Sequence, residues 1–230
     1  MSAAGTVVFD LDGTLTDSRP GILRSTRYAL RRLNEATGAA HPIPEEDALE
    51  YMIGPPMRET FAGLVGPDLV EPLLSFYRER YATVGLFENA VFDGVTDALQ
   101  ALRAGGYRLF VATSKNEADA RRILDHFGLT KFFADIYGAR SDGSRAVKSD
   151  LLAYLLAREN IEADAARVAM IGDRKFDALG ARQVGLSALG ALWGYGSRLE
   201  LVEAGADPLI DTPRQIPDAI AATLVHGAAR

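Results

Sequence analysis

Short apolar runs without polar alternation constrain the fold of this chain more than any other feature. The first run, residues 6–9, consists only of β-branched and aromatic residues. Similar runs occupy residues 107–112 and 168–171 and, more weakly, residues 134–137 and 186–189. Such runs are typical of strands that are buried on both faces of a sheet. The chain is therefore expected to build a sheet that other elements cover on both sides.

Amphipathic segments separate these runs. They cover residues 95–103, 117–127, 149–159 and 176–184. In the first of them, apolar residues recur at helical spacing until Gly105 ends the pattern. Strands that alternate with helices of this length imply right-handed βαβ units. We therefore predict an α/β fold with a mostly parallel sheet.

Residues 18–89 break this alternation, because they contain helical patterns and no convincing strand. One apolar stripe of helical spacing follows Pro20, and residues 69–84 form a second stripe. A helical insertion directly after the first strand explains this break. We therefore expect a core domain of residues 1–17 and 90–230 that carries a separate helical domain.

Two aspartates follow the first apolar run at alternate positions, and a Gly-Thr turn comes directly after them. Asp10 and Asp12 stand where the expected strand ends, and Gly13 and Thr14 begin the turn. In an open parallel sheet, ligands bind beyond the carboxyl ends of the strands, and N–H groups of such a turn bind anions. We therefore expect Gly13 to contact an anionic substrate. Two carboxylates this close repel each other unless a cation or proton intervenes, and Mg²⁺ suits such oxygen ligands.

Polar residues also stand at the ends of other expected elements. The second long apolar run is followed by Thr113 and Ser114, which supply two hydroxyl groups. The third long run is followed by Asp173 and Asp177, and Lys148 opens the helix that precedes this run. Because parallel strands end at one edge of their sheet, we expect these residues to lie near the aspartate pair.

These residues resemble the four motifs of the haloacid dehalogenase-like hydrolases. Residues 10–14 match the first motif, and Thr113 matches the second. Lys148 matches the third motif, and Asp173 with Asp177 matches the fourth. The order and the spacing agree over essentially the whole chain. The resemblance implies a Rossmann-like parallel-sheet core with an α-helical cap inserted after the first strand.

The resemblance also implies a reaction. Asp10 would attack the phosphorus of a phosphomonoester and form an aspartyl-phosphate. Asp12 would protonate the leaving oxygen and then take a proton from the water that hydrolyses the intermediate. Thr113 and Lys148 would bind the phosphoryl oxygens, and Ser114 would contact the substrate beside them.

A magnesium ion is the cofactor that this resemblance implies. The Asp10 carboxylate, the Asp12 backbone carbonyl and Asp173 would hold it. Asp177 would orient Lys148 or a metal-bound water. The charge balance requires such a cation, because four aspartates face one lysine and a dianionic substrate.

The helical insertion would select the substrate. Residues 53–59 resemble the specificity loop of the cap, in which Arg58 would bind a carboxylate or a second phosphate. The alternative is an arginine on the surface at the start of a helix. None of the four lysines of the chain lies in the insertion, whereas the phosphonate hydrolases of the family need one there. Asp12 favours phosphoryl chemistry over dehalogenation.

Two branches of phosphatases remain open. The cap loop and residues 192–196 look like those of phosphoglycolate phosphatases. Ser149 in place of a usual proline, together with residues 141–145 and 92–95, looks more like the 5′-nucleotidase-like branch, which we favour. A sugar phosphomutase similar to β-phosphoglucomutase and a non-catalytic binding protein on the same fold are the alternatives.

The composition narrows the class of protein further. The chain has 25 Lys and Arg against 31 Asp and Glu, and this net charge of −6 argues against nucleic acid or anionic membranes as partners. The absence of cysteine excludes disulfides, thiol nucleophiles and zinc thiolate sites. The first residues lack the pattern of a secretory signal. We expect a cytoplasmic monomer or small homo-oligomer that acts on a small phosphomonoester.

Overall fold

The chain forms two compact units. The computed structural model describes residues 4–53, 57–140, 144–164 and 166–226. Met1–Asp17 and Val91–Arg230 make up the first unit, which we call the core unit. Ser18–Ala90 make up the second, which we call the helical unit.

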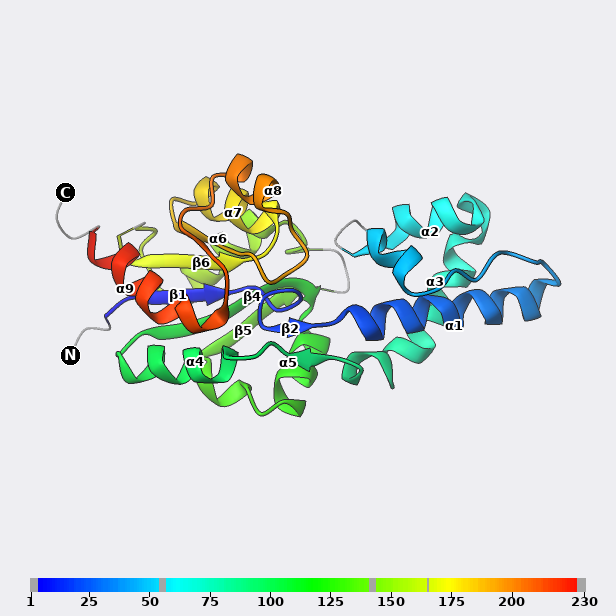
Figure 1. Cartoon of the computed structure of the whole chain (residues 1–230), viewed down its shortest axis with the longest axis horizontal. Coiled ribbons are helices and arrows are strands. Elements are labelled where there is room, and N and C mark those ends of the chain that lie inside the picture. The colour runs from blue at the N-terminus through cyan, green and yellow to red at the C-terminus, as the bar shows by residue number, and fades with distance from the viewer. Residues whose placement is uncertain (1–3, 54–56, 141–143, 165, 227–230) are drawn as a thin grey trace. The chain divides into compact units, whose positions relative to one another are not determined.

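The core unit is built on a six-stranded sheet whose neighbouring strands all run parallel. The strand order is β5-β4-β1-β6-β7-β8 (Figure 1). The strands are β1 (Thr6–Phe9), β4 (Arg108–Asn116), β5 (Asp135–Ala139), β6 (Val168–Gly172), β7 (Ser187–Ala191) and β8 (Leu209–Ile210). The α/β fold with a parallel sheet that the sequence predicts is therefore confirmed.

The register of the three central strands brings their carboxyl ends to one edge of the sheet. Phe9, the last residue of β1, pairs with Val111 of β4 and with Ile171 of β6. All four residues of β1 are buried, as the lack of polar alternation predicts. The polar residues that follow these positions in the three strands therefore lie close together.

Helices cover both faces of this sheet. They are α4 (Val95–Ala104), α5 (Glu117–His126), α6 (Lys148–Glu159), α7 (Lys175–Gln183), α8 (Arg198–Ala204) and α9 (Ile216–His226). Helices α6, α7 and α8 lie over one face, and α4, α5 and α9 lie over the other (Figure 1). Apolar side chains of α6, α7 and α8 form one buried cluster with Val8, Phe110 and Met170 of the sheet. This packing fixes the start of α6 and of α7, where charged residues stand.

The helical unit consists of α1 (Arg19–Thr37), α2 (Met57–Val65) and α3 (Val70–Tyr81), together with short 3₁₀ turns. In the sequence it is flanked by the short strands β2 (Thr16–Asp17) and β3 (Ala90–Val91). The described part of residues 18–89 contains no strand, as expected. Across the described chain, no helix has both the length and the apolar character that a bilayer crossing requires.

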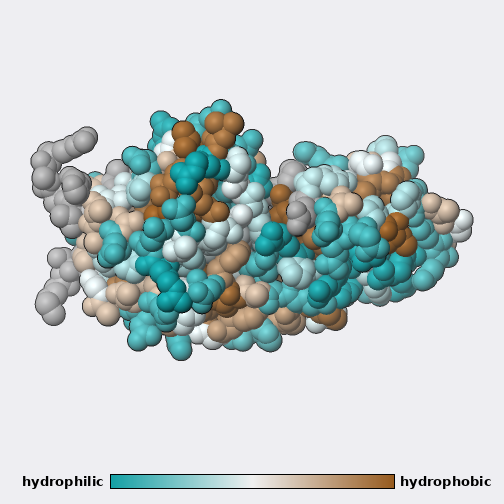
Figure 2. Space-filling view, in the orientation of Figure 1, coloured by the Kyte–Doolittle hydropathy of each residue, from teal (hydrophilic) through white to brown (hydrophobic). Residues whose placement is uncertain are grey.

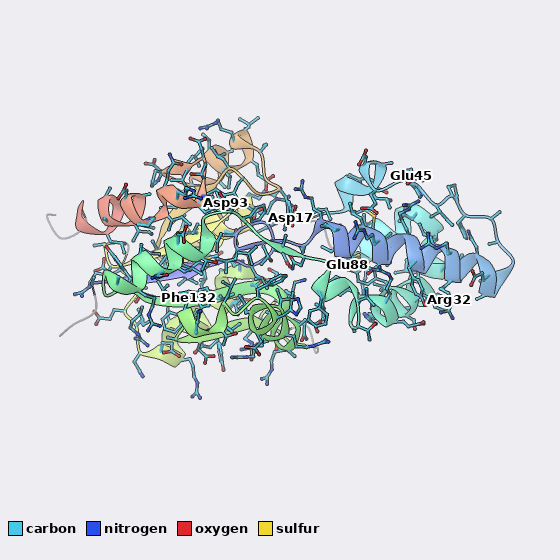
Figure 3. The ribbon with its side chains drawn as sticks, turned by 60° about the horizontal axis from the view of Figure 1, so that its bottom comes forward. Asp17, Arg32, Glu45, Glu88, Asp93 and Phe132 are labelled. Atoms are coloured by element: carbon cyan, nitrogen blue, oxygen red, sulfur yellow. The ribbon has the colours of Figure 1, made fainter. Side chains whose placement is uncertain are left out.

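An ion-pair network accompanies the apolar interior of the helical unit. Arg80 of α3 donates two hydrogen bonds of 2.7 and 2.9 Å to the carboxylate of Glu88. Arg32 of α1 donates to Glu79 of α3 at 2.8 Å (Arg32 and Glu88 are labelled in Figure 3). Leu30 of α1 is fully buried. The unit therefore has its own interior and its own polar contacts between helices.

Four strands differ from the sequence prediction, which includes neither β2 nor β3. β4 continues to Asn116, whereas the apolar run predicts an end at residue 112. The extension carries polar residues, and its register with β5 shifts between Thr113 and Asn116, so hydrophobic periodicity gives no sign of it. β8 was not predicted, because two residues are too few for a periodic pattern. The extension of β4 matters most, because it carries Thr113 and its polar neighbours.

Candidate active site

A buried lysine stands at the centre of the charged residues at the carboxyl edge of the sheet. Lys148 is the first residue of α6, and only 4% of its side chain is exposed. Its Nζ lies 3.0 Å from Asp10 Oδ1 and 2.7 Å from Asp177 Oδ1, and it donates to the Ala112 carbonyl at 2.8 Å. Burial alone lowers the pKa of Lys148, but the two carboxylates outweigh it and raise this pKa. The lysine is therefore charged and holds two aspartates together.

Asp173 directly follows β6 and is fully buried. Its carboxylate accepts hydrogen bonds from Thr14 Oγ1 at 3.1 Å and from the Tyr195 N–H at 2.8 Å. Burial, and then repulsion by Asp177 and Asp10, raises the pKa of Asp173 to about 8. This carboxyl group therefore resists ionisation unless a cation compensates its charge.

Asp177 stands in the first turn of α7 and accepts a hydrogen bond from the Arg174 N–H at 3.1 Å. Burial raises the pKa of Asp177 to about 6, although Lys148 opposes the shift. Among the described residues, one carboxylate oxygen each of Asp10, Asp173 and Asp177 lies within 4.8 Å of the others. Lys148 pairs with only two of these three aspartates, Asp10 and Asp177, so the ionised cluster carries excess negative charge.

This cluster fits a divalent metal ion. Mg²⁺ prefers carboxylate oxygens, and three of them converge from Asp10, Asp173 and Asp177. The pKa of Asp173 is raised because its carboxyl group is buried beside like charges. A bound cation would compensate these charges. Asp12 adds a fourth carboxylate nearby in sequence, and its Oδ1 is buried with no hydrogen-bond partner. The donor set thus agrees with the magnesium site that the resemblance implies.

The second aspartate of the first motif has a different partner from the first. Asp12 Oδ2 lies 2.9 Å from Lys115 Nζ, whereas Asp10 contacts Lys148. Lys115 belongs to the polar extension of β4 and is itself largely buried. Asp10 and Asp12 therefore pair with different lysines. The sequence places the cation of Lys115 at the end of this strand, but it gives no sign that Asp12 is its partner.

Gly13 allows the motif to approach Asp173. Its φ is 85°, and a Cβ at this position would overlap the Asp173 carboxylate. The Gly13 N–H donates to the Thr16 carbonyl at 2.8 Å, and the Thr14 N–H donates to the Leu11 carbonyl at 3.3 Å. These contacts form the turn itself, and the contact of Gly13 with substrate stays a prediction.

Thr113 and Ser114 both lie on the extension of β4. Thr113 is buried, and its Oγ1 accepts from the Lys115 N–H at 3.2 Å. Ser114 is exposed, and its Oγ donates to the Ala146 carbonyl at 3.4 Å, two residues before Lys148. The structure thus places both hydroxyls at the edge where Asp10 and Lys148 meet. Their contacts with a phosphoryl group stay predictions.

Arg58 belongs to the helical unit, where it is the second residue of α2. Its exposed side chain forms an ion pair with Glu71 of α3. Residues 54–56 of the loop that resembles a specificity loop lie outside the described residues. The contact of Arg58 with substrate stays a prediction.

Residues 192–196 also contact Asp173 and the first motif, and these contacts were not predicted from the sequence. The Trp193 Nε1 donates to the Thr14 carbonyl at 3.0 Å, and the Tyr195 hydroxyl donates to Asp17 at 3.1 Å (Asp17 is labelled in Figure 3). A Cβ on Gly194 would overlap Asp173. The available signal was the pair of glycines around Tyr195, which allows this close approach.

Arg145 fixes the loop that leads to Lys148, and sequence reasoning gave it no role. Its backbone has a φ of 61°, which is unfavourable for a residue with a side chain. Its Nη2 lies 3.0 Å from Glu117 Oε2, and its guanidinium carbon lies 4.7 Å from the centre of the Tyr154 ring. Glu117 begins α5, directly after β4, so this ion pair ties the Lys148 loop to the strand of Thr113. Residues 141–143 of the same loop lie outside the described residues.

Comparison with known proteins gives a consistent picture. The family model of the haloacid dehalogenase-like hydrolases matches residues 7–191. A crystal structure of a putative phosphatase from Clostridium difficile superposes with a TM-score of 0.86 at 33% identity, and the match covers 96% of this chain and 100% of that one.

Relatives carry several names. A 5′-nucleotidase of Pseudomonas aeruginosa is 43% identical over 199 residues, which cover 85% of this chain and 86% of that protein. The tyrosine-protein kinase PtkA of Mycobacterium tuberculosis is 45% identical over 190 residues, but these cover 83% of this chain and only 62% of that protein. A phosphoglycolate phosphatase of Caulobacter vibrioides is 33% identical over 226 residues, which cover 93% of this chain and 90% of that protein.

The raised pKa of Asp173 leads to a stability prediction. The folded protein holds a proton at Asp173 up to pH about 8, whereas the unfolded chain loses it near pH 4, so stability falls as the pH rises through this window. Asp173→Asn removes this loss of stability, because an amide does not ionise. Without metal, we expect the variant to exceed the natural protein in stability by between about 1 and 5 kcal/mol at pH 8.5, and by less at pH 5.

Thermal and urea unfolding in the presence of a chelator measure this difference. Added Mg²⁺ should stabilise the natural protein and leave Asp173→Asn nearly unchanged. Asp150→Asn, an exposed position on α6, is the matched control and should respond to Mg²⁺ as the natural protein does. A metal-free Asp173→Asn variant that is less stable than the natural protein at pH 8.5 would contradict this account of the cluster.

Proposed function

The chain belongs to the haloacid dehalogenase-like hydrolases and hydrolyses phosphomonoesters, and we propose that it does so with Mg²⁺ through an aspartyl-phosphate on Asp10. The observation that carries the proposal is the buried Lys148 between Asp10 and Asp177. A structural ion pair would not need the third buried carboxylate, that of Asp173, near the two that pair with Lys148, because the excess charge destabilises the fold. A site for a metal ion and a phosphate does need it.

Asp10 is the proposed nucleophile. Its backbone N–H donates to the Ile171 carbonyl at 2.9 Å, and Lys148 holds its Oδ1, so the carboxylate has a fixed direction. In the first step, an Asp10 oxygen forms a bond to phosphorus while the bond to the leaving oxygen breaks. Lys148 and the hydroxyl of Thr113 would bind the phosphoryl oxygens during this transfer.

Asp12 is the proposed general acid and base. It gives a proton to the leaving oxygen in the first step, and it takes a proton from water in the second. That water attacks phosphorus, the bond between phosphorus and Asp10 breaks, and inorganic phosphate leaves. Both aspartates then have their starting protonation. The contact with Lys115 orients the Asp12 side chain and leaves its Oδ1 without a hydrogen-bond partner.

Asp10, Asp173 and the Asp12 backbone carbonyl are the proposed magnesium ligands, with Asp177 beside them. When bound, Mg²⁺ supplies positive charge that reduces the repulsion between the Asp10 carboxylate and a phosphate dianion. Thr14 and the Tyr195 N–H orient the Asp173 carboxylate for this role through their hydrogen bonds.

We propose nucleoside monophosphates as the preferred substrates and the helical unit as the cap that selects them. The 43% identity to a protein named 5′-nucleotidase supports this choice, as do Ser149 and residues 92–95. Phosphoglycolate is the second candidate, supported by the relative of that name. Arg58 is the proposed substrate contact of the helical unit.

Substitution of the two motif aspartates tests the mechanism. Asp10→Asn should lower kcat by at least about 10³-fold, because an amide cannot attack phosphorus. Asp12→Asn should lower kcat by roughly 10²–10⁴-fold, because no group then exchanges the protons. Phosphate release is measured with and without Mg²⁺, and Asp150→Asn should match the natural protein. An Asp10→Asn variant that retains phosphatase activity in a clean preparation would rule the mechanism out.

A panel of substrates tests the proposed specificity. We expect kcat/KM for at least one nucleoside 5′-monophosphate to exceed that for phosphoglycolate by about tenfold or more. The reverse order would assign the chain to phosphoglycolate. Two product assays address the other classes. Isomerised sugar phosphate in place of free phosphate would indicate a mutase, and transfer from ATP to a tyrosine peptide faster than phosphate release would indicate a kinase.

Arg145 gives a test of how Lys148 is positioned. Arg145→Ala should lower kcat by roughly tenfold or more with little change in KM, because the Lys148 loop loses its tie to Glu117. Arg145→Lys should recover part of kcat, since it keeps the charge but loses the contact with Tyr154. Arg122→Ala, which alters an exposed pair on α5, serves as the control. Equal losses of kcat in Arg145→Ala and Arg122→Ala would argue against the positioning role.

A further inference from the structure

Four large apolar side chains are exposed together on α7 and α8. Phe176, Leu179, Leu199 and Val202 are 48%, 48%, 65% and 55% exposed. They are half of the eight large apolar residues that are exposed in the described chain. Figure 2 shows hydrophobic side chains gathered over this part of the core unit, at the top of the view. We call these four residues the apolar face.

The apolar face is continuous across the two helices. Phe176 and Leu179 lie three residues apart on α7, as Leu199 and Val202 do on α8, so each pair occupies one side of its helix. A groove of about 380 Å³ runs between the helices, with Leu179 and Leu199 in its lining. Exposed apolar groups that lie together in this way, rather than singly, are typical of interaction surfaces.

The two helices run side by side in the same direction. At their starts, the Lys175 N–H donates to Glu200 Oε1 at 2.9 Å. At their ends, Arg182 Nη1 donates to the Ala204 carbonyl at 3.3 Å. The catalytic cluster does not use the apolar face, because Asp177 lies on the buried side of α7. The proposed chemistry therefore leaves these exposed side chains unexplained.

The charges around the apolar face separate by helix. The exposed ends of α7 carry the cations Lys175 and Arg182. The groove is lined on α8 by the anions Glu200 and Glu203. Glu200 also pairs with Arg174 of its own chain at 2.9 Å, and the cation of α8, Arg198, pairs with Asp211 at 3.2 Å. A two-fold axis parallel to the helices would place α7 of one copy over α8 of the other. Lys175 would then face Glu200 of the second copy, and Arg182 would face Glu203 of the second copy.

We propose that the apolar face is the contact surface of a homodimer of this chain. A two-fold interface uses the same patch on both copies, so the patch must complement itself. The apolar face complements itself in shape of contact and in charge. Apolar side chains of one copy would pack on apolar side chains of the other, and the cations of α7 would face the anions of α8. A partner of a different kind would not require opposite charges on the two helices.

Analytical ultracentrifugation of the full chain tests the proposal. The natural protein should sediment as a dimer at about 100 μM, a concentration that populates dimers with a Kd in the micromolar range. Leu199→Glu should be monomeric at this concentration and keep its phosphatase activity, because Leu199 is exposed and lies outside the site. Val84→Glu, at an exposed apolar position of the helical unit, is the matched control and should remain dimeric.

A charge exchange tests the predicted orientation. Glu203→Arg should raise the dimer Kd by about tenfold or more, because the new cation would face Arg182 of the second copy. Adding Arg182→Glu to the same chain should restore much of the affinity. A natural protein that stays monomeric at about 100 μM, or a dimer that Leu199→Glu leaves intact, would overturn the proposal.

Discussion

The ion pairs of the buried Lys148 with Asp10 and Asp177 are the interaction on which the rest of this site depends. They join the end of β1 to the starts of α6 and α7, and Lys148 also donates to the carbonyl of Ala112 in β4. A lysine buried to this degree stays charged only because carboxylates face it. The parallel register of the sheet makes this possible, since it brings the strand ends to one edge.

The charges of the same cluster do not balance. Lys148 compensates part of the charge of Asp10 and Asp177, and Asp173 adds a third carboxylate whose pKa rises to about 8. Fold stability alone would favour fewer acidic groups. The imbalance suits a site that becomes neutral only when a divalent cation binds, and the cation in turn allows a dianionic substrate to approach a carboxylate nucleophile. The excess negative charge of the cluster thus accounts both for the raised pKa of Asp173 and for the proposed need for a metal ion.

The parallel sheet could be predicted from the sequence. So could the proximity of the polar residues that stand at the ends of its strands. The sequence indicated Asp10 and Asp173 because they follow clear apolar runs, and Lys148 because it opens the amphipathic helix before one of these runs. Arg145 and Tyr195 were missed, because each acts through a long-range contact: an ion pair with Glu117 and a backbone hydrogen bond to Asp173. Local periodicity carries no information about such contacts. The polar end of β4 was missed for a related reason, since its pairing rather than its composition makes it a strand.

The covalent intermediate is the central claim, and acid quenching during turnover tests it most directly. A phosphomonoester with a labelled phosphoryl group is mixed with the enzyme and Mg²⁺, the reaction is stopped with acid, and the labelled peptide is located by mass spectrometry. The account predicts a phosphoryl group on Asp10 that forms and decays at least as fast as phosphate is released. Absence of protein-bound phosphate, together with inversion of configuration at phosphorus, would contradict it.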